Sequence, residues 1–288
     1  MRNSIRALKA MVAAGAVLIL VMVVAGAALI LAAPAAHADP LDDIVIAHRA
    51  GATSRYGEGT LASYKHSVAN HADILDGDIH WTKDSPNDSD KLGSILVIHD
   101  STLDRITNCK GKVSSWLWTS IRDKCRTDVG KQRLIRLKDL VRYAKSVRKP
   151  LAIQFKQRTI TKAQAKQLWK TIKYSNVQLE AASYALPALN KVKKLDAADR
   201  KHKINYALVT AGSGGWPSVS KVKRVGTYLH AKLSIPASRM RTYKKAGIKV
   251  FLWTGKNRSD YKRMARLEPY GVVVNDVAKF QAWRKSQI

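Results

Sequence analysis

Nine short apolar runs recur along the chain from residue 44 onward, and stretches with helical periodicity separate most of them. The runs that we expect to form strands are 44–47, 74–79, 95–98, 151–155, 177–181, 204–209, 225–229, 248–253 and 271–274. The expected helices are 61–69, 137–147, 162–172, 185–198, 237–246, 260–267 and 278–283. Regular alternation of strands and helices predicts an α/β fold with a parallel sheet.

The segment between the second and third runs departs from this alternation. It is rich in Asp, Asn, Ser and Pro and too short for a crossover helix, so we expect the third run to return as the antiparallel arm of a β-hairpin. Eight strand–helix units then remain, which is the count of a TIM (βα)8 barrel. We therefore predict a single barrel domain over 39–288, with a β-hairpin after strand 2 and an irregular inserted loop over 101–136.

The second run alternates apolar residues with Asp76, Asp78 and His80, so a strand here projects three polar side chains from one face. Two buried carboxylates this close repel each other unless a cation, a shared proton or a basic partner compensates them. This pattern is typical of a divalent-metal site. A half-exposed edge strand with polar residues facing water is the alternative.

Polar residues follow several other strands at the edge where the loops of a barrel meet. His48 and Arg49 follow the first run, His99 ends the hairpin, and Lys156 follows the fourth run. Arginine and lysine can neutralise the charge that grows on phosphate oxygens, and histidines can move protons to and from reacting oxygens. The set indicates phosphoryl chemistry, although the order of the two histidine roles stays open.

The amino-terminal segment has a basic start, an apolar run over 11–33 and an Ala36-His37-Ala38 site, which together predict a secretory signal peptide over 1–38. The apolar run is also long enough to span a bilayer if it is not cleaved, which would anchor the protein in a membrane. In both cases the domain is extracellular. An oxidising compartment favours a disulfide between Cys109 and Cys125, the only cysteines.

The chain is strongly basic, with 51 Lys and Arg against 21 Asp and Glu. The segment 1–38 holds three of the basic residues and no acidic ones, so the remainder carries a net charge of +27 from 48 basic and 21 acidic residues. Such a surface attracts an anionic wall polymer or a membrane surface, or serves solubility alone. We find no zinc-finger, RNA-binding or basic-zipper pattern, so we expect no specific nucleic acid partner.

Several motifs in the same order along the chain resemble the glycerophosphodiester phosphodiesterase family, whose members share a barrel with phosphatidylinositol-specific phospholipase C. The motifs are Ile46-Ala47-His48-Arg49, Glu58-Gly59-Thr60, Asp76-Gly77-Asp78 with the downstream Thr82-Lys83-Asp84, Val97-Ile98-His99-Asp100 with the downstream Asp104-Arg105, Gln154-Phe155-Lys156, Trp253-Thr254 and Asn275-Asp276.

The resemblance implies a metal-dependent phosphodiesterase that splits a small phosphodiester or phospholipid substrate into a glycerol phosphate and an alcohol. The implied roles are catalysis by His48, His99 and Arg49, substrate binding by Lys156 and Trp253, and Ca²⁺ or Mg²⁺ binding by Asp76, Asp78, Glu58 and Gln154. Trp253 is equally compatible with a packed core side chain.

Three positions depart from the family pattern. Asp76 replaces the first glutamate of E-x-D, Gly59 replaces the asparagine of E-N-T, and Gln154 replaces the glutamate of E-x-K. A neutral amide at Gln154 removes one formal negative charge, so metal affinity should fall. Two further hypotheses follow, which are a weakened barrel that binds anionic polymer or membrane, and a phospholipase-D-like enzyme. The oligomeric state is open.

Overall fold

The computed structural model describes residues 44–85, 92–175, 185–199, 204–213 and 215–287, and the backbone of 177–182. Leu41–Ile288 forms one compact unit. The predicted signal peptide or anchor over 1–38 lies outside the described residues. Within the described part of the chain, no helix combines the length and apolar character needed to cross a membrane.

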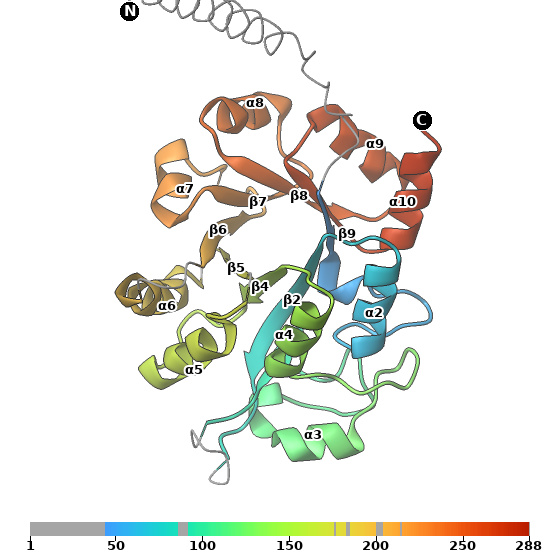
Figure 1. Cartoon of the computed structure of the whole chain (residues 1–288), viewed down its shortest axis with the longest axis vertical. Helices are drawn as coiled ribbons and strands as arrows, with labels where there is room; N and C mark the ends of the chain where they lie inside the picture. Colours follow the sequence, from blue (N-terminus) through green and yellow to red (C-terminus); the bar gives the residue numbers. More distant parts are fainter. Residues whose placement is uncertain are drawn as a thin grey trace, which may run out of the picture. The chain divides into compact units, whose positions relative to one another are not determined.

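Eight parallel strands form a closed barrel (Figure 1). They are β1 (Ile44–Ala47), β2 (Ile74–Trp81), β4 (Leu151–Phe155), β5 (Val177–Ala182), β6 (Asn205–Thr210), β7 (Tyr228–Lys232), β8 (Lys249–Gly255) and β9 (Gly271–Val274). Neighbours along this order pair in parallel, and β1 pairs with both β2 and β9, which closes the ring. The predicted TIM barrel is confirmed.

The strand β3 (Ile95–Val97) is the exception, because it pairs antiparallel with the end of β2. In this register Ile79 lies opposite Val97 and Trp81 opposite Ile95. The β-hairpin after the second barrel strand is therefore confirmed, and residues 86–91 of its connection lie outside the described part.

Helices cover the outside of the ring (Figure 1). They are α2 (Leu61–Ala69), α4 (Leu137–Ser146), α5 (Lys162–Ile172), α6 (Leu186–Ala198), α7 (Val219–Val225), α8 (Ala237–Lys245), α9 (Arg258–Leu267) and α10 (Val277–Lys285). Side chains at several amino-terminal ends satisfy free backbone N–H groups: Thr60 accepts from Ser63, and Asp276 accepts from Lys279.

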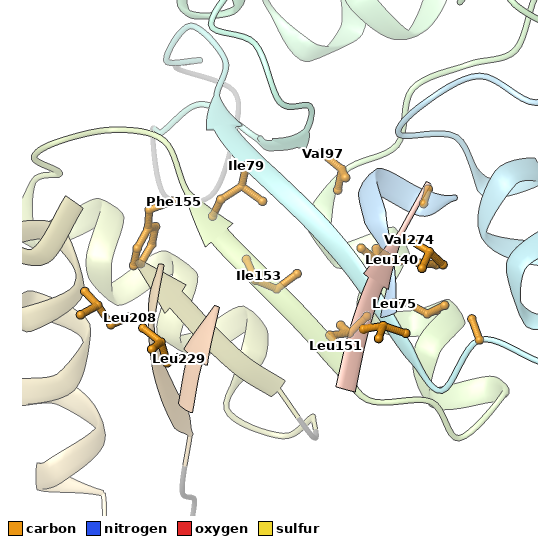
Figure 2. Close-up of a cluster of buried hydrophobic side chains, with 14 of the residues drawn as sticks. Leu75, Ile79, Val97, Leu140, Leu151, Ile153, Phe155, Leu208, Leu229 and Val274 are labelled. Carbon is orange, nitrogen blue, oxygen red and sulfur yellow. The ribbon is translucent and has the colours of Figure 1, made fainter. Parts of the chain in front are cut away.

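The main hydrophobic core lies between the strands and the helices. On β2 the odd-numbered Leu75 and Ile79 pack into it, as do Ile153 and Phe155 on β4 and Leu140 on α4 (Figure 2). Because side chains alternate along a strand, the even-numbered residues of β2 and β4 point to the opposite face, the barrel interior. Asp76, Asp78 and Gln154 belong to that interior set.

The inserted segment after β3 forms a second small core with two short helices, η2 (Val113–Ser115) and α3 (Trp118–Lys124). The buried residues of this core are Leu96, Ile98, Leu103, Ile106, Cys109, Val113, Ile121, Cys125 and Leu134. The predicted disulfide between Cys109 and Cys125 is present, with a sequence separation of 16 and Cα atoms 5.4 Å apart.

Two sequence predictions need correction. The apolar run 225–229 was assigned to a strand, whereas the helix α7 ends at Val225 and β7 begins only at Tyr228. A Cβ on Gly226 would lie 1.9 Å from the Tyr206 carbonyl oxygen, so the connection between α7 and β7 passes too close to β6 for a side chain. Two helices of seven residues were missed: α3 lies within an irregular insertion, and α7 is equally short.

Candidate active site

The site is built on a two-residue spacing along five barrel strands. An inner apolar layer is formed by Ile46, Ile74, Ala152, Phe251 and Val273. Each of these residues is followed, two positions further along the chain, by a residue of the site. These are His48, Asp76, Gln154, Trp253 and Asn275, in the same order. Because every second residue of a strand points the same way, the apolar layer is the floor and the polar residues form the next layer toward the carboxyl ends of the strands.

His48 lies at the carboxyl end of β1, in the short helix η1 (His48–Ala50). Its Nδ1 is 2.7 Å from Asn275 Oδ1, which follows β9. An amide oxygen only accepts, so this contact places the proton on Nδ1 and leaves Nε2 as the nitrogen that can exchange one with a substrate. Burial lowers the pKa of His48 below its ordinary value, although the hydrogen bond to Asn275 partly opposes this effect.

His99 follows β3 and is oriented by a chain of charged groups. Its Nδ1 lies 2.5 Å from Asp100 Oδ1, and Asp100 in turn accepts a short hydrogen bond from the Arg105 Nε. Both terminal nitrogens of Arg105 lie 3.0 Å from the two carboxylate oxygens of Glu58. Burial alone would raise the pKa of Asp100, but hydrogen bonds from Arg105 and His99 lower it to about 2. Asp100 is thus a fixed anion behind His99.

Arg49 connects the carboxylates predicted to bind metal. Its backbone is in the left-handed region, with φ of 52°, and its N–H donates to Asp76 Oδ2 at 2.9 Å. Its guanidinium approaches Asp78 Oδ2 at 3.6 Å and Glu58 Oε2 at 3.7 Å. The arrangement fixes a positive charge beside His48 at the cavity wall.

Lys156 is the second cation of the site. Its ammonium lies 2.9 Å from Asp78 Oδ1 and donates to Gln154 Oε1 at 2.8 Å. The side chain of Asp78 is only 3% exposed, so its burial alone would raise its pKa. The charges of Lys156 and His99 outweigh that effect and lower the pKa of Asp78 below its ordinary value.

His80, the third polar residue of β2, supports the site from behind. Its Nε2 lies 3.0 Å from the backbone oxygen of His99, and its Nδ1 lies 2.9 Å from the Gln157 amide nitrogen. The amide donates to Nδ1, so Nε2 carries the proton and donates to the carbonyl. Burial lowers the pKa of His80, which favours this neutral form.

Two neighbouring cavities meet at His48, Arg49 and Trp253. The first, of about 270 Å³, is lined by His48, Arg49, Asp76, His99, Gln154, Lys156, Val209, Thr210, Ala211, Ser213, His230, Trp253 and Val273. The second, of about 430 Å³, is lined by His48, Arg49, Ala52, Glu58, Arg105, Trp253, Thr254, Lys256 and Asn275. The two cavities therefore offer separate spaces on either side of His48, Arg49 and Trp253.

The structure therefore brings the sequence-predicted residues together. His48, His99, Arg49, Asp76, Gln154, Lys156 and Trp253 line one cavity, Glu58 lines its neighbour, and Asp78 lies directly behind Lys156 and Arg49. The half-buried Trp253 is a cavity wall, and this agrees with substrate contact. The cysteines belong to the separate core of the insertion.

Sequence reasoning missed the partners of the two histidines. Asn275, Asp100 and Arg105 stood in recognised motifs without assigned roles, and the adjacency of Asp100 to His99 was the available signal. His230, a buried residue of β7 that lines the first cavity, was not singled out at all. Its strand gave no signal, because a single histidine in an apolar run is usually a core residue.

The departure at Gly59 has a conformational explanation. Gly59 has φ of 70°, in the left-handed region that glycine adopts freely and asparagine more readily than other residues. A side chain at position 59 would also be crowded, because its Cβ would lie 2.7 Å from the Val97 carbonyl oxygen. The replacement of asparagine by glycine therefore preserves the turn that presents Glu58.

The residues predicted to hold a divalent cation fit it poorly. The oxygens of Asp78 and Gln154 face the Lys156 ammonium, those of Glu58 face Arg105, and Asp76 accepts from the Arg49 backbone. Within the described residues, no group of three or more His, Cys, Asp or Glu side chains is arranged to hold a metal ion. Calcium or magnesium binding stays a prediction.

Comparisons with known proteins agree with this geometry. A profile of the glycerophosphoryl diester phosphodiesterase family matches residues 48–279. The chain is 26% identical over 260 residues to a glycerophosphodiester phosphodiesterase of Caldanaerobacter subterraneus, a match that covers 81% of this chain and 94% of that protein.

Solved structures share the fold. A phosphodiesterase from Oleispira antarctica, crystallised with the product sn-glycerol-3-phosphate, is similar with a TM-score of 0.70 and 17% identity, over 84% of this chain and 96% of that one. A glycerophosphodiester phosphodiesterase from Thermotoga maritima is similar with a TM-score of 0.63 and 20% identity, over 83% and 96% of the two chains. With its barrel, its paired histidines and a match over most of its length, this chain belongs to the glycerophosphoryl diester phosphodiesterase family.

Proposed function

We propose that this protein hydrolyses small glycerophosphodiesters or related phospholipid headgroups to a glycerol phosphate and an alcohol. The observation that carries the proposal is the position of His48 and His99 on one cavity, with Arg49 and Lys156 beside them. Both imidazoles have Nδ1 engaged by the protein, so each offers Nε2 to the substrate. Family membership supports the same reaction class.

The two histidines have different surroundings, and we assign their roles from this difference. His48 accepts a proton from the attacking oxygen, because burial favours its neutral form. His99, held by the Asp100 carboxylate, delivers a proton to the leaving alcohol oxygen as the phosphorus–oxygen bond breaks. If water attacks, glycerol phosphate and alcohol form in one step. If a neighbouring glycerol hydroxyl attacks, the alcohol leaves, a cyclic glycerol phosphate forms, and a water molecule then opens it to glycerol phosphate.

Arg49 and Lys156 contribute charge rather than proton transfer. Both are cations at the cavity wall, and negative charge accumulates on the non-bridging phosphate oxygens as attack proceeds. Fixed cations stabilise that charge more than they stabilise the ground state, because they need no reorganisation during the reaction. Trp253 adds an apolar wall shared by both cavities.

We also propose that the protein is exported. The basic and apolar pattern of residues 1–38 supports a signal peptide, and the disulfide between Cys109 and Cys125 suits an oxidising compartment. Mass spectrometry of the secreted protein would find an amino terminus at Asp39, whereas an intact amino terminus in the membrane fraction would indicate an anchor.

The basic surface suggests a polyanionic form of the substrate, such as a wall polymer or a membrane. Arg105 and Lys256 line the second cavity, where a further phosphate of a polymer would be placed. Rates on a polymeric phosphodiester should then fall steeply with salt, while rates on a small neutral diester should change little.

The decisive assay measures alcohol release by purified protein from glycerophosphocholine, glycerophosphoglycerol, lysophospholipid and sphingomyelin. Release from either glycerophosphodiester supports the proposal. Release from lysophospholipid or sphingomyelin alone would identify a phospholipase-D-like enzyme instead. Absence of turnover on all four, with retained binding to anionic polymer, would favour the weakened barrel that Gln154 suggests.

A further inference from the structure

Lys156 contacts two of the four side chains that the family resemblance assigns to a divalent cation. Its Nζ lies 2.9 Å from Asp78 Oδ1 and 2.8 Å from Gln154 Oε1. The lysine side chain is 14% exposed and the Asp78 side chain 3%, so the ion pair is largely removed from water. Water and salt screen the attraction between two buried charges only weakly, so Asp78 holds the Lys156 ammonium strongly.

The formal charges of the two aspartates and the two cations above the apolar floor are balanced without a metal ion. Asp76 and Asp78 carry two negative charges, and Arg49 and Lys156 carry two positive charges. Both cations face Asp78, whereas Asp76 accepts from the backbone N–H of Arg49. Gln154 contributes an amide oxygen and no charge. A divalent cation added to this group would leave an excess of two positive charges, with an ammonium close to the ion.

Glu58 does not restore the balance. Its two oxygens each lie 3.0 Å from an Arg105 nitrogen, and Oε2 also faces Arg49. Calcium takes six to eight oxygen ligands and magnesium six, with carboxylates supplying most of the charge. Within the described residues, the carboxylates of Asp78 and Glu58 therefore face the protein's own cations, and Asp76 accepts from the backbone N–H of Arg49.

We propose that the Lys156 ammonium, held by Asp78 and Gln154, takes the place of a divalent cation in this chain, so that its hydrolysis of phosphodiesters requires neither Ca²⁺ nor Mg²⁺. Metal binding can be measured without any assay of activity. The part of the proposal that concerns hydrolysis rests on the proposed function. Lys156 and Arg49 then neutralise the two non-bridging phosphate oxygens, and the histidines transfer the protons.

The first experiment measures metal binding without reference to activity. Calcium and magnesium are titrated calorimetrically into the wild-type protein, into Gln154→Glu, and into Gln287→Glu, a control that adds the same charge at an exposed position. We expect no saturable heat for the wild type or the control at micromolar metal. Gln154→Glu should bind calcium at least about tenfold more tightly than the wild type. A tenfold change in Kd needs about 1.4 kcal/mol, and the attraction between a close carboxylate and a divalent ion exceeds that energy.

A second pair of variants tests the lysine itself. Lys156→Met frees the oxygens of Asp78 and Gln154, so calcium should raise the Tm of this variant, while the exposed Lys166→Met control should show no calcium-dependent shift. If Lys156→Met fails to fold, the calcium titrations of the wild type and Gln154→Glu still show whether the wild-type site binds calcium. Micromolar calcium binding by the wild type would overturn the proposal.

The rate measurement compares glycerophosphoglycerol hydrolysis in excess EDTA and in millimolar calcium. We expect the two rates to agree within about twofold. A rate that EDTA abolishes and calcium restores would overturn the inference and leave the proposed function intact. If no condition gives hydrolysis, the proposed function fails, and the calorimetric result still decides whether Lys156 replaces the metal.

Discussion

Asn275 Oδ1 lies 2.7 Å from His48 Nδ1 and joins the end of β9 to the end of β1, the neighbouring strand of the closed barrel. This contact sets the tautomer of His48. We predict that Asn275→Leu lowers kcat by about 10- to 100-fold with little change in KM, because the ring loses its orientation but the phosphate-binding cations remain. Asn190→Leu, at an exposed position of α6, is the matched control, and equal losses in both variants would refute the role.

The pH dependence of kcat/KM should reflect the burial of His48. Because burial lowers the pKa of His48 below 6.5, its neutral, proton-accepting form persists below that pH. The acidic limb of the profile is therefore expected below pH 6.5. The hydrogen bond to Asn275 raises the pKa of His48, so Asn275→Leu should move the limb to still lower pH. A limb above pH 6.5 in the wild type would contradict the assignment.

The titration of Asp100 should make the free energy of unfolding depend on pH in the acidic range. Its folded-state pKa of about 2 lies below the ordinary value of 3.8, so the stabilisation is complete above the unfolded-state pKa and is lost as the pH falls toward 2. Replacement by Asn removes this titration. We expect the Tm of Asp100→Asn to change less between pH 4 and pH 2 than that of the wild type, and parallel curves would show that Asp100 is not coupled to folding.

The disulfide should stabilise the insertion without taking part in catalysis. Cys109 and Cys125 are 16 residues apart, and closing a loop of this size contributes about 3 kcal/mol in the chain-entropy model. For a chain of this size, the Cys109→Ser/Cys125→Ser variant should melt roughly 6 to 12 °C lower. Its kcat at 25 °C should stay within about threefold of the wild type. An unchanged Tm would show that the packing of the insertion core suffices.

The sequence predicted the architecture well because the barrel repeats one simple rule. Each strand alternates between a face that packs on helices and a face inside the ring, and the period-two pattern of Asp76, Asp78 and His80 marked that inner face correctly. The hairpin was predicted from a short polar connection, and the disulfide from the presence of only two cysteines in a chain with a predicted signal peptide.

The contacts that define the site depend on distant parts of the chain. Asn275 meets His48 across 227 residues, and Glu58 meets Arg105 across 47, and neither spacing has a local signature. The shift of β7 relative to the apolar run 225–229 has a similar origin, because Gly226 is required by the close approach of β6. Tertiary packing decided these features.

Whether the predicted metal ligands can bind a cation depends on contacts that residue type alone does not reveal. Asp76, Asp78 and Gln154 supply suitable oxygens, but Lys156 and Arg49 approach the same atoms in the folded chain. A motif states which groups are present, whereas the balance of charge depends on which of them are neighbours.

Joint action of His48 and His99 on one phosphorus can be measured by following glycerophosphoglycerol with ³¹P NMR in the presence of wild type, His48→Ala and His99→Ala. Circular dichroism and Tm establish that each variant is folded. We expect the diester resonance to be replaced by that of glycerol phosphate with the wild type and to persist with both variants. Conversion at a near-normal rate by either folded variant would contradict the joint action of the two histidines.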